Sequence, residues 1–214
     1  MLVIDDDSPD GTARLVAEAA RSEPRLLLLH RTEDRGRGAA GRAGFLRALE
    51  LGADVVVEMD ADFSHQPRFI PDMLRRLDEP ARRGGQEVGV VRGSRGVAGG
   101  SDADRGAIRQ AITLLANAYI RVLLGLPVRD CNSGFRCWRA STLRAIRVED
   151  TFSKGPAIVQ ELLFKTARAK LGIAEVPIDF VDRVRGTSTL SLRSLMQGYT
   201  TVLKLRWMAL CGRL

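Results

Sequence analysis

The sequence predicts an α/β fold, a three-layer α/β/α sandwich around a mostly parallel, doubly wound sheet. Short apolar runs alternate with longer helical patterns along most of the chain, which is typical of such sheets. The 214 residues are enough for one sizeable core. Acidic side chains directly follow two of the apolar runs, at the strand ends where open α/β sheets bind ligands.

The predicted strands are short runs rich in Leu, Val and Ile. They cover residues 2–4, 25–30, 55–57, 88–91 and 173–181, with one more strand after the loop that begins at residue 130. Predicted helices follow the loops at 5–12 and 36–44 and cover residues 69–77, 105–124, 156–171 and 190–210. The helix at 105–124 has apolar residues spaced for one buried face, namely Ile108, Ile112, Leu115, Tyr119, Val122 and Leu123. We expect one domain over residues 1–191 and an amphipathic helix over residues 192–214.

The charge of the chain favours an anionic partner. The formal net charge is +7, which suits phosphate, nucleic acid or an acidic membrane surface. Coding bias toward arginine is the alternative explanation. No aromatic RNA-binding signature, zinc finger or basic tail is present, so we expect no nucleic acid. The three cysteines lack metal-ligand spacing, and no signal peptide is recognisable, which together favour reduced cytosolic thiols.

The stretch at 54–67 is the strongest single indication of chemistry. Three valines form a buried strand that stops at Asp60 and Asp62, and Pro67 then opens a helical pattern. Two carboxylates one residue apart repel each other unless a cation lies between them. Their hard oxygens suit Mg²⁺ or Mn²⁺ holding a diphosphate. A solvated acidic turn is the simpler alternative.

Two further loops are candidates for ligand contacts. Asp5, Asp6 and Asp7 follow the first strand and are placed to accept hydrogen bonds from a nucleotide base or ribose; the alternative is a turn that caps the next helix. The loop at 30–38 lies before a helix N-terminus and is either an anion-binding loop or a solvated connection.

Taken together and in order, these motifs resemble those of the family 2 glycosyltransferases of the GT-A fold, in particular the dolichol-phosphate and polyprenol-monophosphate mannose synthases. The matching segments are 3–12, 59–65 (MDADFSH), 93–95 (GSR), 124–136 (LGLPVRDCNSGFR), 160–161 (QE), 177–183 and 186–191. The resemblance covers nearly the whole chain from Leu2 to about Ser191, and as a set these motifs are highly specific.

The resemblance implies an inverting, metal-dependent glycosyltransferase with a sugar-nucleotide donor, GDP-mannose. Asp5, Asp6, Asp7, Asp60 and Ala61 would then contact the nucleotide. Asp60 and Asp62 would hold Mg²⁺ or Mn²⁺ on the diphosphate, joined by Ser64 or Gln66, between which the sequence does not choose. His65 is better explained as a structural residue than as a ligand.

The implied acceptor is polyprenyl or dolichyl phosphate, whose nucleophile is already an oxyanion and needs no general base. Catalysis would rest on positioning and on charge neutralisation by the metal and by arginines. By position in the family, the acceptor phosphate would be held by Arg95, Arg109, Thr113, Arg136, Arg183 and Thr189. The catalytic residues would be Asp130, Arg95 and Arg183, with Asp130 positioning the acceptor.

The chain departs from the family pattern in two places. Relatives usually have a strand, a loop and a helix before the segment that starts here at Leu2. The missing strand is central, so we expect altered pairing or a gap in the sheet, from a misassigned start or a truncated gene copy. Thr189 stands where relatives usually have lysine, which should weaken the hold on one phosphate.

Several alternatives remain open at this point. The donor is GDP-mannose or, in a close rival, UDP-glucose or another sugar nucleotide. A non-catalytic nucleotide-binding relic and a metal-dependent phosphatase are rivals from other classes. The helix at 192–214 either lies on a membrane surface or simply covers the sheet. We expect a cytoplasmic protein, peripheral at the cytoplasmic face of a membrane.

Overall fold

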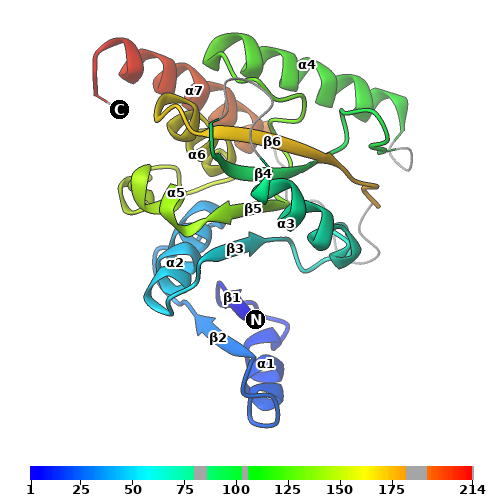
Figure 1. Ribbon diagram of the computed structural model, residues 1–214. Helices are drawn as coiled ribbons and strands as arrows, with labels where there is room; N and C mark the ends of the chain where they lie inside the picture. The colour runs from blue at the N-terminus through cyan, green and yellow to red at the C-terminus, as the bar shows by residue number, and fades with distance from the viewer. Residues whose placement is uncertain (80–85, 103–105, 182–191, 214) are drawn as a thin grey trace.

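The computed structural model describes residues 1–79, 86–102, 106–181 and 192–213 (Figure 1). Its strands are β1 Leu2–Asp5, β2 Leu27–His30, β3 Val55–Glu58, β4 Val88–Ser94, β5 Arg136–Arg139 and β6 Gly172–Pro177. Its helices are α1 Thr12–Ala20, α2 Arg37–Glu50, α3 Ile70–Asp78, α4 Ala107–Leu124, α5 Ala140–Ala145, α6 Ile158–Arg168 and α7 Leu192–Leu210. Two single 3₁₀ turns, η1 Pro67–Phe69 and η2 Val148–Asp150, complete the described elements.

The strands of the described residues form two sheets. β1 and β2 pair in parallel, with Leu2 opposite Leu27. The second sheet has the order β3-β5-β4-β6, in which β4 and β6 are parallel. β5 runs antiparallel to both of its neighbours. The predicted α/β alternation is therefore confirmed, and β5 is the strand that departs from the parallel arrangement.

The expected interruption of the sheet is present. Within the described part of the chain, β1 and β3 belong to separate sheets and share no ladder. Helix α2 spans the interruption, because it packs on β1 and also on α6 (Figure 1). Gly44 allows this close approach, since a Cβ there would lie 2.9 Å from the Ile4 Cδ1 atom.

The four-stranded sheet has a hydrophobic core on each face. Val90 and Trp138 face a cluster that also holds residues from α2, α4, α6 and α7. Val91 and Cys137, one position along each strand, face a second cluster with Met73 and Leu77 of α3. This alternation follows from the period of two along a strand, and it produces the expected three layers.

The predicted buried face of α4 is right for Tyr119 and Leu123, which are partly buried and pack against the core, and wrong for three other residues. Ile112, Leu115 and Val122 are exposed, Val122 at 83%, whereas Asn117, Ile120 and Leu124 are buried. The side chain of Ile108 lies outside the described residues. The helix is apolar nearly all round, so its periodicity does not select a face. Asn117 faces inward because it accepts a hydrogen bond from the Cys131 N–H at 2.8 Å.

Helix α7 packs against α4 and α6, and Val202 and Leu205 on its inner side join the core. Among the described helices, none is long and apolar enough to cross a membrane.

Candidate functional site

The loop after β3 holds the paired carboxylates in a compact turn. The Asp60 N–H donates to Nδ1 of His65 at 3.0 Å. One oxygen of Asp62 accepts from both the backbone N–H and the hydroxyl of Ser64, at 3.1 and 2.5 Å. Phe63 between them takes a left-handed conformation, with φ of 65°. Ser64 thus orients Asp62, and Gln66 follows as the residue before η1.

His65 has a packed, structural environment. Its ring is buried, stacks on Phe135 with centroids 5.2 Å apart, and meets the edge of Phe180. Burial lowers the pKa of His65 below its usual value, although the Asp60 carboxylate opposes this effect. Because Nδ1 accepts the Asp60 N–H, the neutral ring carries its proton on Nε2. His65 therefore shapes the carboxylate loop.

Arg37, which the sequence analysis did not single out, is the cation nearest to the carboxylate loop in the described structure. Its guanidinium donates to Asp60 at 2.9 Å and also faces Glu58 and Asp62. Burial acts to raise the pKa of Asp60, but Arg37, His65 and Arg136 together outweigh it and the net pKa is lowered. Gly38 fixes the start of α2, because its N–H donates to the Lys154 carbonyl at 2.7 Å. Arg37 is thus a tethered counter-ion of Asp60.

The donor set fits a divalent metal that is shared with a diphosphate. Within the described ranges, no group of three or more His, Cys, Asp or Glu side chains is placed to hold a metal ion by itself. Mg²⁺ is usually held by one or two carboxylates together with substrate phosphates. Asp60 and Asp62 supply such carboxylates, and the Asp60 side chain is 42% exposed, so a ligand can reach it.

Replacing Arg37 should strengthen metal binding in the absence of nucleotide. A metal ion at Asp60 has to compete with the Arg37 guanidinium, and a partly exposed ion pair of this kind is worth a fraction of a kcal/mol to about 1 kcal/mol. We expect Arg37→Gln to raise the Mn²⁺ affinity roughly two- to fivefold, measured by electron paramagnetic resonance titration. The matched control is Arg68→Gln, which removes a 2.9 Å pair with Asp179. An unchanged or lower affinity in Arg37→Gln would show that Arg37 does not compete for Asp60.

The acidic loop after β1 is tied to the loop after β2. Asp6 accepts from Arg31 and from the Gly36 N–H, both at 2.5 Å. Asp7 pairs with Arg35 at 3.0 Å, and Asp5 is buried and accepts the Ser8 N–H. The alternative role as a capping turn is confirmed in part. Gly11 is the N-cap of α1 and has no side chain, but the Asp10 carboxylate accepts the backbone N–H of Thr12, the first residue of α1, at 3.0 Å. These carboxylates and the loop at 30–38 therefore form one polar edge of the small sheet.

The end of β4 carries a buried ion pair. Nε and Nη2 of Arg95 donate to the two oxygens of Asp130 at 2.7 and 3.0 Å. Asp130 also accepts the backbone N–H groups of Asn132 and Ser133 and is 1% exposed. Burial acts to raise the pKa of Asp130, but Arg95, Arg92 and the Asn132 N–H lower it to about 2. Asp130 therefore stays ionised at neutral pH and positions Arg95, which suits a positioning residue better than a general base.

Two other arginines lie beneath this edge. Arg92 and Arg136 face each other across β4 and β5 and are fully buried. Arg136 contacts the carboxylate of Glu58, its neighbour on β3, and lies over the Trp138 ring at 5.3 Å. Burial lowers the pKa of Arg136 to about 10, with Glu58 opposing. Arg136 therefore stabilises the position of β3 through Glu58. The sequence analysis did not identify Arg92 as a buried residue near the site, because it comes directly after the valines of an ordinary strand pattern.

An amide network holds the loop between α4 and β5. The Asn132 side chain donates to Asn117 at 2.7 Å and accepts from Gln160 at 2.8 Å. The Glu161 carboxylate accepts hydrogen bonds from the backbone N–H groups of Phe152 and Ser153. The next residue, Lys154, has the carbonyl that accepts the Gly38 N–H. The motif at 160–161 therefore joins the Asp130 loop to the start of α2.

The other predicted acceptor residues lie on α4 or outside the described residues. Arg109 and Thr113 are four positions apart near the start of α4. The start of α4 lies near Arg95 through Asp102. The Gln110 side chain donates to the Asp102 carbonyl, and the Asp102 carboxylate acts to raise the pKa of Arg95. Arg183 and Thr189 are outside the residues that the structure describes.

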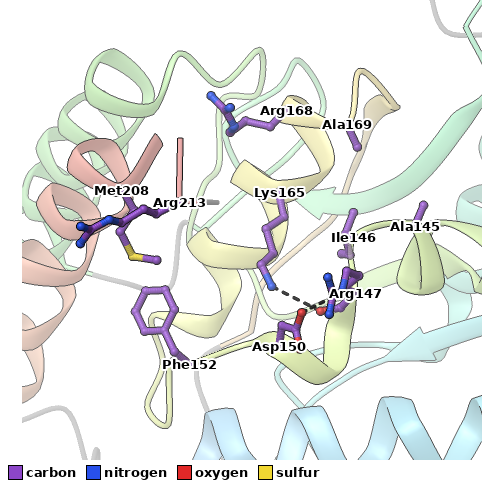
Figure 2. Close-up of a pocket in the computed structure, with 10 residues that line it drawn as sticks. All are labelled: Ala145, Ile146, Arg147, Asp150, Phe152, Lys165, Arg168, Ala169, Met208 and Arg213. Carbon is purple, nitrogen blue, oxygen red and sulfur yellow. Dashed lines mark hydrogen bonds and ion pairs between the residues drawn. The ribbon is translucent and has the colours of Figure 1, made fainter. Parts of the chain in front are cut away.

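A cavity of about 440 Å³ lies elsewhere, between η2, α6 and α7 (Figure 2). Its lining contains none of the predicted site residues. It consists of Ala145, Ile146, Arg147, Asp150, Phe152, Lys165, Arg168, Ala169, Met208 and Arg213.

Comparison with known proteins gives consistent results. The family described as Glycosyl transferase family 2 matches residues 1–140. An undecaprenyl-phosphate mannosyltransferase from Micrococcus luteus is 40% identical over 218 residues, covering 100% of this chain and 86% of that protein. A polyprenol monophosphomannose synthase from Mycolicibacterium smegmatis is 38% identical, covering 89% of this chain and 70% of that protein.

Solved structures support the fold. Glucosyl-3-phosphoglycerate synthase from Mycobacterium tuberculosis, in complex with Mn²⁺, UDP-glucose and phosphoglyceric acid, matches with a TM-score of 0.64 at 21% identity. The match covers 99% of this chain and 68% of that chain. The same synthase with Mg²⁺ and UDP matches with a TM-score of 0.63 at 22% identity. The predicted GT-A fold is confirmed by this likeness.

Proposed function

We propose that this chain, which belongs to glycosyl transferase family 2, transfers mannose from GDP-mannose to polyprenyl phosphate. The chain is a glycosyltransferase. The observation that carries the finer proposal is the similarity over its whole length to an undecaprenyl-phosphate mannosyltransferase. The arrangement of carboxylates and arginines around β3 and β4 supports it.

The proposed reaction is a single displacement with inversion. A phosphate oxygen of the lipid attacks the anomeric carbon of mannose, and the bond between that carbon and the diphosphate oxygen breaks. GDP leaves with the electron pair and the mannosyl phosphate lipid forms. The nucleophile is already an oxyanion, so no proton has to be removed from it.

In this proposal, one set of residues binds the donor and another set binds the acceptor. Asp60 and Asp62 would hold Mg²⁺ or Mn²⁺, which when bound neutralises charge on the leaving diphosphate. Asp5, Asp6 and Asp7 line the edge where the nucleoside would bind. Arg95, held in place by Asp130, would orient the acceptor phosphate together with Arg109 and Thr113. We extend this role to Arg183 and Thr189 on the family pattern alone.

The acceptor is a lipid, so the proposal includes a location. We propose that the protein is peripheral at the cytoplasmic face of a membrane, where a sugar nucleotide and a polyprenyl phosphate can meet. Transfer would then take place at the interface.

The donor is tested by comparing two labelled sugar nucleotides. Purified protein, Mn²⁺ and undecaprenyl phosphate are incubated with labelled GDP-mannose or labelled UDP-glucose, and label entering the organic phase is counted. We expect label from GDP-mannose, with unlabelled GDP-mannose competing better than unlabelled UDP-glucose. Label from UDP-glucose alone would keep the lipid acceptor and overturn the proposed donor.

A further inference from the structure

The two groups of carboxylates assigned to the donor lie on separate sheets. Asp6 follows β1 in the two-stranded sheet, and Asp60 follows β3 in the four-stranded sheet. Within the described ranges, no backbone ladder joins these sheets, so other contacts have to fix their relative position. A sugar nucleotide that contacts both groups requires them to be held in one arrangement.

The start of α2 contacts both groups through adjacent residues. The Gly36 N–H donates to Asp6 at 2.5 Å, and the Arg37 guanidinium donates to Asp60 at 2.9 Å. Gly36 is the N-cap of α2, and Arg37 is its first residue. A displacement of this helix end would therefore move both donors away from their carboxylates.

The loop of residues 151–155 fixes the start of α2. The Lys154 carbonyl accepts the N–H groups of Gly38 and Ala39, at 2.7 and 3.3 Å. The first N–H groups of a helix have no partner within the helix, so this carbonyl supplies one. The approach is close, because a Cβ on Gly38 would lie 2.1 Å from the Ser153 carbonyl oxygen. The position of the loop therefore determines the position of the first turn of α2.

The Glu161 carboxylate in turn holds this loop. Its side chain is 0% exposed, and its two oxygens accept the backbone N–H groups of Phe152 and Ser153 at 3.0 and 2.9 Å. Lys165, one turn further along α6, lies 3.8 Å from the same carboxylate. Hydrogen bonds from two consecutive N–H groups to one carboxylate fix the local backbone in a single conformation.

We propose that Glu161 is a positioning residue for the sugar-nucleotide donor. It holds the 151–155 loop, the loop holds the start of α2, and the start of α2 holds Asp6 and Asp60 in the arrangement that binds the nucleotide. The inference rests on the proposed function for the identity of the donor. It assigns Glu161 no contact with a substrate and no proton transfer. Its neighbour Gln160 bonds instead to Asn132, on the acceptor side of the site.

Glu161→Gln tests this role at its source. The amide accepts from only one of the two backbone N–H groups and turns its own N–H toward the other. We expect the KM for GDP-mannose to rise about tenfold or more, with the KM for undecaprenyl phosphate within about twofold of wild type. The matched control is Thr166→Val, which removes a buried 2.8 Å hydrogen bond within α6 and should leave both KM values within about twofold.

Gly38→Ala perturbs the same contact from the side of α2 and leaves Glu161 intact. The new Cβ would meet the Ser153 carbonyl oxygen, so the loop or the helix has to shift. The control is Gly41→Ala, one turn along α2, whose Cβ would make an ordinary contact at 3.6 Å with Cδ1 of Ile158. Gly38→Ala should raise the KM for GDP-mannose, whereas Gly41→Ala should not.

Arg42→Gln decides the question if neither of these variants folds. The Arg42 side chain is 31% exposed, and it donates to the Thr151 carbonyl at 2.8 Å. Its control is Arg47→Gln, which breaks an exposed pair with Glu50 on the same helix. We expect the KM for GDP-mannose to rise roughly two- to threefold in Arg42→Gln and to stay unchanged in Arg47→Gln.

Two binding measurements separate a failure of this inference from a failure of the proposed function. Calorimetry measures the Mn²⁺-dependent binding of GDP and of UDP, and deuterium exchange measures the amides of Gly36, Gly38 and Ala39. We expect Glu161→Gln to bind the nucleotide more weakly and to exchange these amides faster, relative to the rest of α2. If UDP binds in place of GDP, the KM comparison is made with UDP-glucose.

If the wild type binds neither nucleotide, the proposed function fails and this role fails with it. If the wild type binds a nucleotide and Glu161→Gln binds it equally well, only the positioning role is overturned. Unchanged exchange of these amides, or equal rises in the KM values of donor and acceptor, would overturn it as well.

Discussion

Asp60→Asn is expected to reduce mannosyl transfer on the order of 10²–10³-fold while leaving the fold intact. The substitution keeps the size of the side chain and removes the charge that would hold the metal on the diphosphate. Asp60 is partly exposed and its hydrogen bond to His65 comes from the backbone, so the turn should persist. The loss should appear in transfer by the lipid-phase assay and also in metal-dependent GDP binding, which is measured by calorimetry.

The control for this variant is Asp72→Asn. Asp72 is an exposed acid in the first turn of α3, paired with Arg75 at 3.0 Å. It loses one negative charge in the same way but lies outside the carboxylate loop. Transfer by Asp60→Asn within a factor of about three of the control would contradict the assigned metal position.

Asp130→Asn is expected to destabilise the protein by about 3–5 kcal/mol and to reduce transfer as well. The Asp130 carboxylate neutralises Arg95 and lies close to Arg92, and all three side chains are withdrawn from solvent. An amide removes the carboxylate that bonds directly to Arg95, and removing one partner of a buried ion pair is strongly destabilising. Urea unfolding at neutral pH measures the change. Asp179→Asn, which removes only an exposed pair with Arg68, should cost about 1 kcal/mol or less.

The pH dependence of stability distinguishes the ionised carboxylate from a packing effect. The pKa of Asp130 is about 2 in the folded protein, below the reference value of 3.8. The contribution of the ionised Asp130 carboxylate to the free energy of unfolding is therefore present above about pH 4 and is lost as the pH falls through about 2. Wild type should lose stability more steeply than Asp130→Asn as the pH falls below about 4. Parallel curves of stability against pH for the two proteins would show that the charge of Asp130 does not stabilise the fold.

The sequence was sufficient for the fold and the family because their signals are local and ordered. The valine run before Asp60, the leucines of β2 and the helical patterns each predict one element. Their order, together with the motifs, predicts the GT-A fold and the glycosyltransferase family, and both are confirmed. The separation of β1 from β3 was also expected from the motif comparison, and the structure shows it.

Other features depend on contacts that a linear pattern does not contain. Arg37 approaches Asp60 only because Gly38 fits beneath the carbonyls of residues 153–155. Arg92 and Arg136 become neighbours through the register of β4 with β5. For α4, apolar residues lie on both sides of the helix, so the pattern wrongly placed Ile112, Leu115 and Val122 on the buried face. The inward position of Asn117 depends on the hydrogen bond that it accepts from the Cys131 N–H. The roles assigned to the site residues stay predictions.

The most direct test of the proposed reaction measures both products together. Wild type and Asp60→Asn are incubated with GDP-mannose and undecaprenyl phosphate, with Mn²⁺ or with a chelator, and GDP and mannosyl lipid are quantified by mass spectrometry. The account predicts equal amounts of GDP and mannosyl lipid from wild type with Mn²⁺, and little of either in the other three mixtures. GDP without mannosyl lipid would indicate hydrolysis, and neither product with any tested donor would indicate a nucleotide-binding relic.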